Sequence, residues 1–84
     1  MYKYESMKSV LFTDAGQRKF IKTIDFVKEV IQKAGCVRMD VVLSRIGGDA
    51  WEVMACVDRL VELGELKEVL QCGAFGQDRI FIST

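Results

Sequence analysis

Proline and histidine are absent from this 84-residue chain, and long apolar runs are absent too. Without histidine, the chain lacks the side chain that most often serves as a general base near neutral pH. It also lacks a glycine-rich phosphate loop and a recognisable nucleophile motif, so we do not expect an enzyme. No stretch approaches the roughly 20 apolar residues that span a bilayer, and no signal-peptide core stands at the start. We therefore expect a cytoplasmic protein with no membrane partner.

Cysteine is scarce as well. Cys36, Cys56 and Cys72 form no C-x-x-C pair. A tetrahedral zinc site needs about four thiolate or imidazole ligands, and this pattern does not supply them. We predict three reduced, partly buried cysteines that pack as small apolar side chains. The sequence predicts no metal site and no cofactor.

The residues that are present describe one folded domain with an uneven charge distribution. Half of them are apolar and 29% are charged, a composition typical of globular proteins. Residues 1–38 hold eight cations and four anions, whereas residues 39–84 hold four cations and eight anions, although the net charge is zero. The two halves are electrically complementary. A homodimer is therefore one possibility, with Tyr2, Tyr4 and Phe12 at its seam.

The helix predicted over residues 50–63 organises the chain. Asp49 is a suitable N-cap and Glu52 lies three residues later, which together form a capping box. Gly64 marks the end of the helix. Helical spacing separates an apolar core stripe from an opposite, outward face. The stripe contains Val53, Met54, Cys56, Val57, Leu60 and Val61, and the outward face contains Trp51, Glu52, Ala55, Asp58, Arg59 and Glu62.

A longer helix is predicted from about Ala15 to the residue before Gly35. Asp14 and Gln17 form a second capping-box pattern at its start. Its core positions are Phe20, Ile24, Val27, Ile31 and Ala34, with Arg18, Lys22 and Lys33 on the outward face. This basic face either meets phosphates or an acidic protein, or it only solvates the helix. Residues 1–14 form an N-terminal arm: a frayed end, an extra helical turn, or a patch that packs on a second subunit.

The remaining segments are short. Residues 36–38 are predicted to form a brief strand, residues 40–46 a second helix, and Gly47–Gly48 a tight turn. Residues 66–71 and 79–83 are rich in Leu, Val, Ile and Phe and flank a glycine-containing loop. This arrangement predicts a β-hairpin.

Helix, short strand, helix, glycine turn, helix and hairpin is an order that resembles the winged helix-turn-helix family. The run VVLSRIGGDAWEVMACVDRLVELGEL is the most telling part, because its end matches the pattern L-x-x-L-G-x-L at Leu60, Leu63, Gly64 and Leu66. The resemblance covers residues 15–84. It implies an α+β fold, three helices with a short first strand and a C-terminal hairpin wing, in a small DNA-binding transcriptional regulator that acts as a dimer or within a larger assembly.

The resemblance also implies which residues would contact duplex DNA. In the family, the helix matching residues 50–63 commonly enters the major groove, and the wing touches the DNA backbone or minor groove. Carried over by position, the candidate DNA-binding residues are Arg45, Trp51, Glu52, Ala55, Arg59, Glu62, Lys67, Gln77 and Arg79.

Charge argues for a different partner. The outward face of the helix has Glu52, Asp58 and Glu62 against Arg59 alone, and phosphate contacts need cations or donors. The wing tip has no lysine or arginine and shows Phe75 instead. The alternative is a winged helix that binds a partner protein through Trp51, Asp58, Glu62 and Phe75. Trp51 either anchors such a partner or folds back over its own domain.

Overall fold

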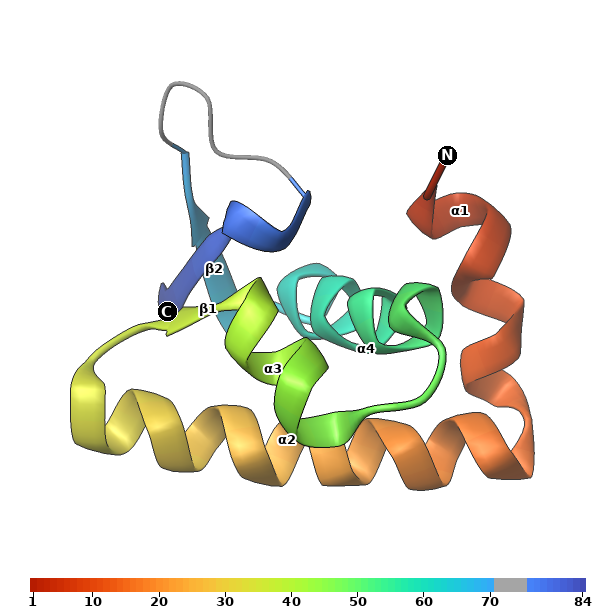
Figure 1. The fold of residues 1–84 in the computed structure, drawn as a ribbon, viewed down its shortest axis with the longest axis horizontal. Helices are drawn as coiled ribbons and strands as arrows, with labels where there is room; N and C mark the ends of the chain where they lie inside the picture. Colours follow the sequence, from red (N-terminus) through yellow and green to blue (C-terminus); the bar gives the residue numbers. More distant parts are fainter. Residues whose placement is uncertain (71–75) are drawn as a thin grey trace.

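The computed structural model describes residues 1–70 and 76–84, and within them the chain is an α+β fold (Figure 1). Four α-helices and a small antiparallel sheet at one end of the molecule make up the fold, and two short 3₁₀ helices complete the described elements. In chain order they are α1 (Tyr4–Met7), η1 (Lys8–Phe12), α2 (Asp14–Ala34), β1 (Val37–Arg38), α3 (Met39–Ile46), α4 (Ala50–Glu62), β2 (Leu66–Val69), η2 (Gly76–Asp78) and β3 (Ile80–Ser83).

The start of α2 differs from the prediction. Its N-cap is Thr13, whose hydroxyl accepts a hydrogen bond from the Gly16 amide at 3.0 Å, and Asp14 is already helical. Thr13 is extended, with φ −91° and ψ 163°, so its short side chain reaches the first turn where Asp14 was expected to act. The side-chain amide of Gln17 does not reach back to the N-cap and instead donates a hydrogen bond to the Leu11 carbonyl. A contact with the preceding segment therefore replaces the expected capping box.

The predicted start of α4 is confirmed in its main feature. The Asp49 carboxylate accepts from the Trp51 amide at 2.9 Å. The carboxylate of Glu52 instead faces Lys19 of α2 at 3.8 Å. The turn before the helix needs both glycines, since Gly47 and Gly48 have φ values of 73° and 77° that side chains with a Cβ resist.

The C-terminal hairpin forms as predicted, and a third strand joins it. β2 and β3 pair antiparallel, with Lys67 opposite Ile82 and Val69 opposite Ile80. β1 pairs with the other edge of β3, which gives the strand order β1-β3-β2. Phe81 in the central strand is fully buried because its side chain points to the core. The side chains of Ile80 and Ile82 alternate to the opposite face of the sheet and are half-buried. The sheet thus closes one side of the core.

The main core lies among α2, α3, α4 and this sheet. Most of the predicted stripe of α4 packs into it: Val53 and Val57 are fully buried, and Leu60 is 2% exposed. Val27 of α2 and Val42 of α3 are fully buried beside these residues. Cys56 is also fully buried, but in a second apolar cluster with Leu11 and Ala55. Within the described ranges, no helix has the length and apolar character needed to cross a membrane, and no cluster of acidic or cysteine side chains is arranged to hold a metal.

Of the cysteines, Cys56 is buried, whereas Cys36 is exposed, which corrects the expectation that it would be partly buried. It follows Gly35 in the connection between α2 and β1, outside the packed layers. Cys72 lies outside the described residues.

Candidate functional site

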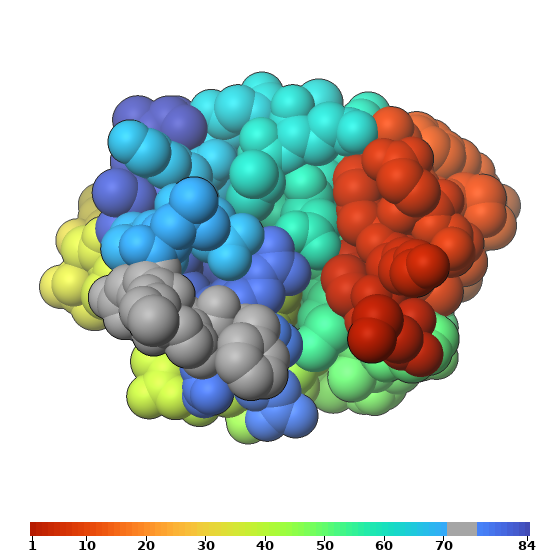
Figure 2. All heavy atoms as spheres, turned by 90° about the horizontal axis from the view of Figure 1, so that it is seen from above, coloured from red at the N-terminus to blue at the C-terminus, as the bar shows by residue number. Residues whose placement is uncertain are grey.

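The N-terminal segment is neither frayed nor detached. Residues 2–12, called the arm from here on, form α1 and η1, double back from the start of α2 and lie on α4. Figure 2 shows the arm in red as a block against the green and cyan surface of α4. The side of α4 that the sequence predicts to face solvent is therefore covered in large part by the chain itself.

The polar contacts between the arm and α4 all end on two carboxylates. The Tyr2 hydroxyl donates to Asp58 at 2.5 Å, and the Tyr4 hydroxyl donates to Glu62 at 2.8 Å. Lys8 forms an ion pair with the other oxygen of Glu62 at 2.8 Å. Hydrogen bonds to a charged acceptor are stronger than those between neutral groups. Two phenols and one ammonium thus satisfy the acidic positions of α4.

An apolar contact anchors the same arm. Leu11 is 1% exposed and packs with Ala55 and Cys56 of α4, both of which are fully buried. The expectation that Ala55 lies on an outward, DNA-facing surface is therefore wrong. Its small side chain is what leaves room for Leu11, and the burial of a leucine stabilises the contact by about 2 kcal/mol.

A single glycine permits the sharp reversal between the arm and α2. A Cβ added to Gly16 would lie 2.0 Å from the carbonyl oxygen of Val10 and 2.9 Å from the Cα of Leu11. Both atoms belong to the backbone, so a flexible side chain cannot move aside to relieve the clash. Glycine is required at position 16 because η1 approaches so closely, and not because the backbone there has a positive φ.

The arm contacts shift the ionisation of the groups involved. Hydrogen bonds from Lys8, Arg59 and Tyr4 lower the pKa of Glu62 to about 2. Burial and the hydrogen bond to Glu62 raise the pKa of Tyr4 to about 12. Burial, followed by the hydrogen bond to Asp58, also raises the pKa of Tyr2 well above its ordinary value. The contact is therefore made between an ionised carboxylate and neutral phenols.

Arg79, a candidate DNA contact, lies in an ion-pair network at the junction of the sheet and α4. Its guanidinium donates to Asp58 at 2.6 Å and to Glu68 at 2.8 Å, and its side chain is only 16% exposed. Burial lowers the pKa of Arg79, but the hydrogen bonds to Glu68 and Asp58 outweigh this effect and raise it. Asp58 thus joins the arm, through Tyr2, to the residue just before β3, through Arg79.

The other charged candidates on α4 are also paired within the chain. Arg59 forms an ion pair with Glu62 at 2.5 Å and lies over the ring of Phe12, 5.5 Å from its centroid. Glu52 has Lys19 as its nearest cation. All three carboxylates predicted to give this face its negative charge therefore have a cation within 4 Å. The same pairing occupies the arginines that DNA phosphates would need.

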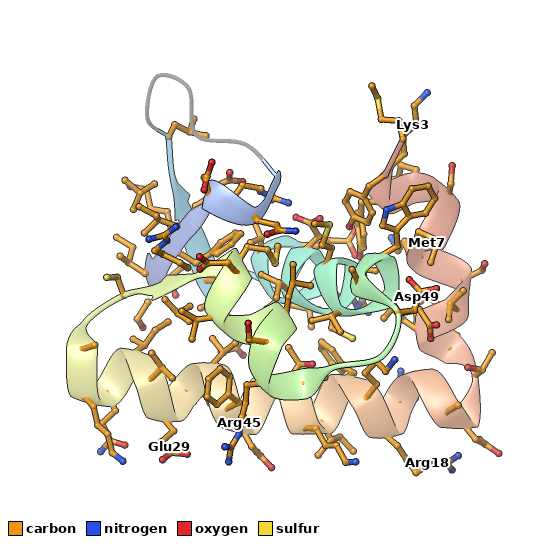
Figure 3. The ribbon with its side chains drawn as sticks, viewed as in Figure 1. Lys3, Met7, Arg18, Glu29, Arg45 and Asp49 are labelled. Atoms are coloured by element: carbon orange, nitrogen blue, oxygen red, sulfur yellow. The ribbon has the colours of Figure 1, made fainter. Side chains whose placement is uncertain are left out.

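The remaining DNA candidates lie elsewhere on the surface. Arg45 of α3 is exposed, with its guanidinium 5.8 Å from the centroid of Phe26, and lines a groove with Lys22 and Glu29. Figure 3 shows Arg45 and Glu29 on the side of α2, away from Lys3 of the arm. The exposed Lys67 in β2 and Gln77 in η2 lie on the sheet side, and Phe75 lies outside the described residues. The sequence candidates are thus not brought to one face.

For Trp51 the sequence left two alternatives open, an exposed anchor for a partner and a side chain folded back over its own domain, and the structure combines features of both. Trp51 is 43% exposed, and its ring meets the edge of Tyr2, with centroids 6.3 Å apart. It therefore lies against the arm, whereas the folded-back alternative placed it over the helix at residues 40–46 or over the hairpin. The exposed remainder of the indole borders the arm contact.

The sequence placed Tyr2 and Tyr4 at a possible homodimer seam, whereas they contact α4 of their own chain. It did not single out Lys8 and Leu11 of the arm or Gly16 of α2, which complete the contact. One signal was available. Apolar and aromatic residues in a segment without a clear period indicate burial against another surface. The complementary charge of the two halves of the chain pointed the same way, since a basic first half would favour the acidic α4.

Comparison of the chain with protein-family models, with curated proteins and with solved structures gave no match.

Proposed function

We propose that this chain is a protein-interaction module with a winged-helix arrangement, and that its binding surface is the face of α4 bearing Trp51, Asp58 and Glu62. The ligand is a short amphipathic polypeptide segment that presents hydroxyl or ammonium donors beside a leucine-sized apolar side chain. The arm is the resident example of such a segment.

The arm contact on α4 carries this proposal. In this contact, hydroxyl groups of the arm donate hydrogen bonds to Asp58 and Glu62. Leu11 is buried beside them, in the notch that the small side chain of Ala55 leaves on α4. A directed polar rim around a small apolar centre is the general pattern of protein interfaces. Trp51 borders the contact, and exposed tryptophans are enriched among the residues that dominate binding energy.

The electrostatics of the face favour a polypeptide over a nucleic acid. Carboxylates attract phenols and ammonium groups, whereas they repel phosphates, which supply most of the non-specific affinity for DNA. Arg59 and Arg79 already hold Glu62, Asp58 and Glu68. If the arm left, Asp58 and Glu62 would lose hydrogen-bond donors, and this face of α4 would carry a larger net negative charge because Lys8 would leave with the arm. DNA binding, which the order of elements first suggested, is the alternative outcome of the test below.

The test uses a full-length variant in which the arm is released. Leu11→Ala removes the apolar anchor of the chain's own arm, while Gly16 and every contact residue of α4 stay unchanged. At low micromolar concentration, ¹⁵N-labelled L11A is titrated with a synthetic peptide of the unaltered residues 1–12 and, separately, with a random-sequence DNA duplex at low salt. We expect the peptide to shift the Trp51 indole and the Asp58 and Glu62 amides saturably, and the duplex to leave them in place.

Matched variants separate the contact from general charge. In the L11A background, Glu62→Gln should weaken peptide binding several-fold, because it removes the charged acceptor of Tyr4 and Lys8. Glu65→Gln alters an exposed carboxylate that forms no hydrogen bond or ion pair with the arm in the described part of the chain, and it should leave binding unchanged. Duplex-induced shifts around Arg45 and Arg59 that weaken with salt, together with no response to the peptide, would establish DNA binding instead.

A further inference from the structure

We infer that the segment bound by this face is the arm of a second copy of the chain, so that two molecules exchange arms reciprocally. This inference rests on the proposed function and names its partner. In the exchanged dimer, the arm of each copy lies on α4 of the other, with Tyr2 on Asp58 and Leu11 over Ala55. The structure shows the closed form, in which each chain holds its own arm.

The link between arm and body suits such an exchange. Thr13 alone separates η1 from α2, and its backbone is extended. A change at this one residue is enough to direct the arm away from its own body. Short hinge segments favour exchange, because they force a sharp reversal in the closed form and a simple extension in the open one. No proline stands at the hinge to fix either form.

The contacts between the arm and α4 can be made again between two copies. Their hydrogen bonds and ion pair join residues 54 to 58 positions apart, so none of them depends on local chain continuity. The charge distribution favours the same pairing: residues 1–38 carry a net positive charge and residues 39–84 a net negative one. The two forms differ at the hinge, where Thr13 bonds to Val10 only in the closed form, and protein concentration and the hinge decide between them.

Both forms need Gly16. The carbonyl of Val10 and the Cα of Leu11 occupy the space beside it where a Cβ would lie, whether the docked arm belongs to the same chain or to the second copy. Gly16→Ala should therefore weaken arm docking in the closed monomer and in the exchanged dimer alike.

The test follows the Lys8–Glu62 ion pair across chains. Equal amounts of ¹⁴N and ¹⁵N protein are mixed in urea, refolded together, concentrated to about the millimolar effective concentration of a short tether, and treated with a zero-length carbodiimide. This reagent joins an amine and a carboxylate in direct contact, as Lys8 and Glu62 are at 2.8 Å. Mass spectrometry of the digest then shows whether the two joined peptides carry the same isotope or different ones.

We expect Lys8–Glu62 pairs of mixed isotope in the wild-type protein, and few Lys8–Glu62 pairs of either kind in G16A, whose arm docks poorly in both forms. Pairs within the body serve as the control: Lys33–Glu29 lies within α2, and Lys19–Glu52 joins α2 to α4, so both should carry a single isotope. Lys8–Glu62 pairs that stay single-isotope in the wild-type protein would overturn arm exchange. The peptide titration on L11A reports separately, because peptide binding with no mixed pairs refutes exchange alone.

Discussion

The two long sides of α4 are packed by different means. One side faces the main core and is buried through Val53, Val57 and Leu60, whose contacts are apolar and without preferred direction. The other side faces the arm and is held by directed pairs on Asp58 and Glu62 around the small Ala55 notch. The first side defines the fold, whereas the second resembles an interface between two molecules.

This difference predicts two modes of failure. Damage on the core side should unfold the whole domain, because α2, α3, α4 and the sheet share one cluster. Damage on the arm side should release the arm and leave the body folded, because the arm meets the body through one surface and one hinge residue. The variants below test this contrast in order of decreasing effect.

Phe81→Ala should have the largest effect. Phe81 is fully buried in the central strand, and truncating a buried phenylalanine costs about 4 kcal/mol. In a domain of this size, that loss approaches the whole free energy of unfolding. Urea denaturation monitored by circular dichroism should show a protein that is largely unfolded. A variant that retains wild-type stability would show that the sheet does not close the core.

Arg79→Met should follow. The substitution keeps the apolar bulk of the side chain but leaves Asp58 and Glu68 without their shared cation. Breaking a buried ion pair on one side costs about 3 kcal/mol. The loss is measured as a fall in the urea midpoint. Lys67→Met in β2 is the matched control, because it removes an exposed cation and little change in the urea midpoint is expected. Equal losses in both variants would refute a structural role for the Arg79 network.

Leu11→Ala should act locally. The truncation removes the apolar anchor of the arm and costs about 2 kcal/mol of docking free energy. Amide hydrogen exchange should become fast across residues 4–12, while the amides of β2 and β3 keep their protection. Ile21→Ala provides the control, since that side chain is 57% exposed on α2. Loss of protection throughout the domain would show that the arm and the core unfold as one unit.

The arm contact should depend on pH at both extremes. Glu62 has a lowered pKa of about 2, so its contribution to docking is complete above its ordinary value of 4.5 and is lost as pH falls toward 2. Tyr4 has a raised pKa of about 12, so its contribution is present below 10 and is lost as pH rises toward 12. Trp51 fluorescence, which senses the adjacent Tyr2, reports both transitions.

A variant separates these two limbs. Glu62→Gln should remove the acid limb, because glutamine does not titrate, while the alkaline release remains. An acid transition of unchanged midpoint in this variant would show that another group controls docking.

The sequence predicted the elements of the core side well. The helices near residues 15–34, 40–46 and 50–63 and the terminal hairpin were recognisable from apolar periodicity, from Asp49 as a cap and from glycines at the turns. These signals are local, and each depends on residues within a few positions of one another. The winged-helix family and its functions remain a prediction.

The arm side was not predictable by the same means. Ala55, Asp58 and Glu62 fall on the polar face of a helical projection, and such residues usually face solvent. Their partners Tyr2 and Tyr4 lie more than 50 positions away and show no period that reveals a packing face. The prediction of Asp14 as the N-cap of α2 was wrong for the same reason. The close approach of η1 at Gly16 decides the geometry there and makes Thr13 the N-cap.

The docking of the arm on α4 is tested most directly by a nuclear Overhauser spectrum of the wild-type protein at neutral pH and at the lowest usable concentration. An arm that lies on α4 gives cross-peaks between the Leu11 methyl groups and the Ala55 methyl group, together with cross-peaks between the Tyr2 ring and the Trp51 indole. A spectrum in which the core cross-peaks of Phe81 are present but both of these sets are missing would contradict this docking, because the polar face of α4 would then be open to solvent.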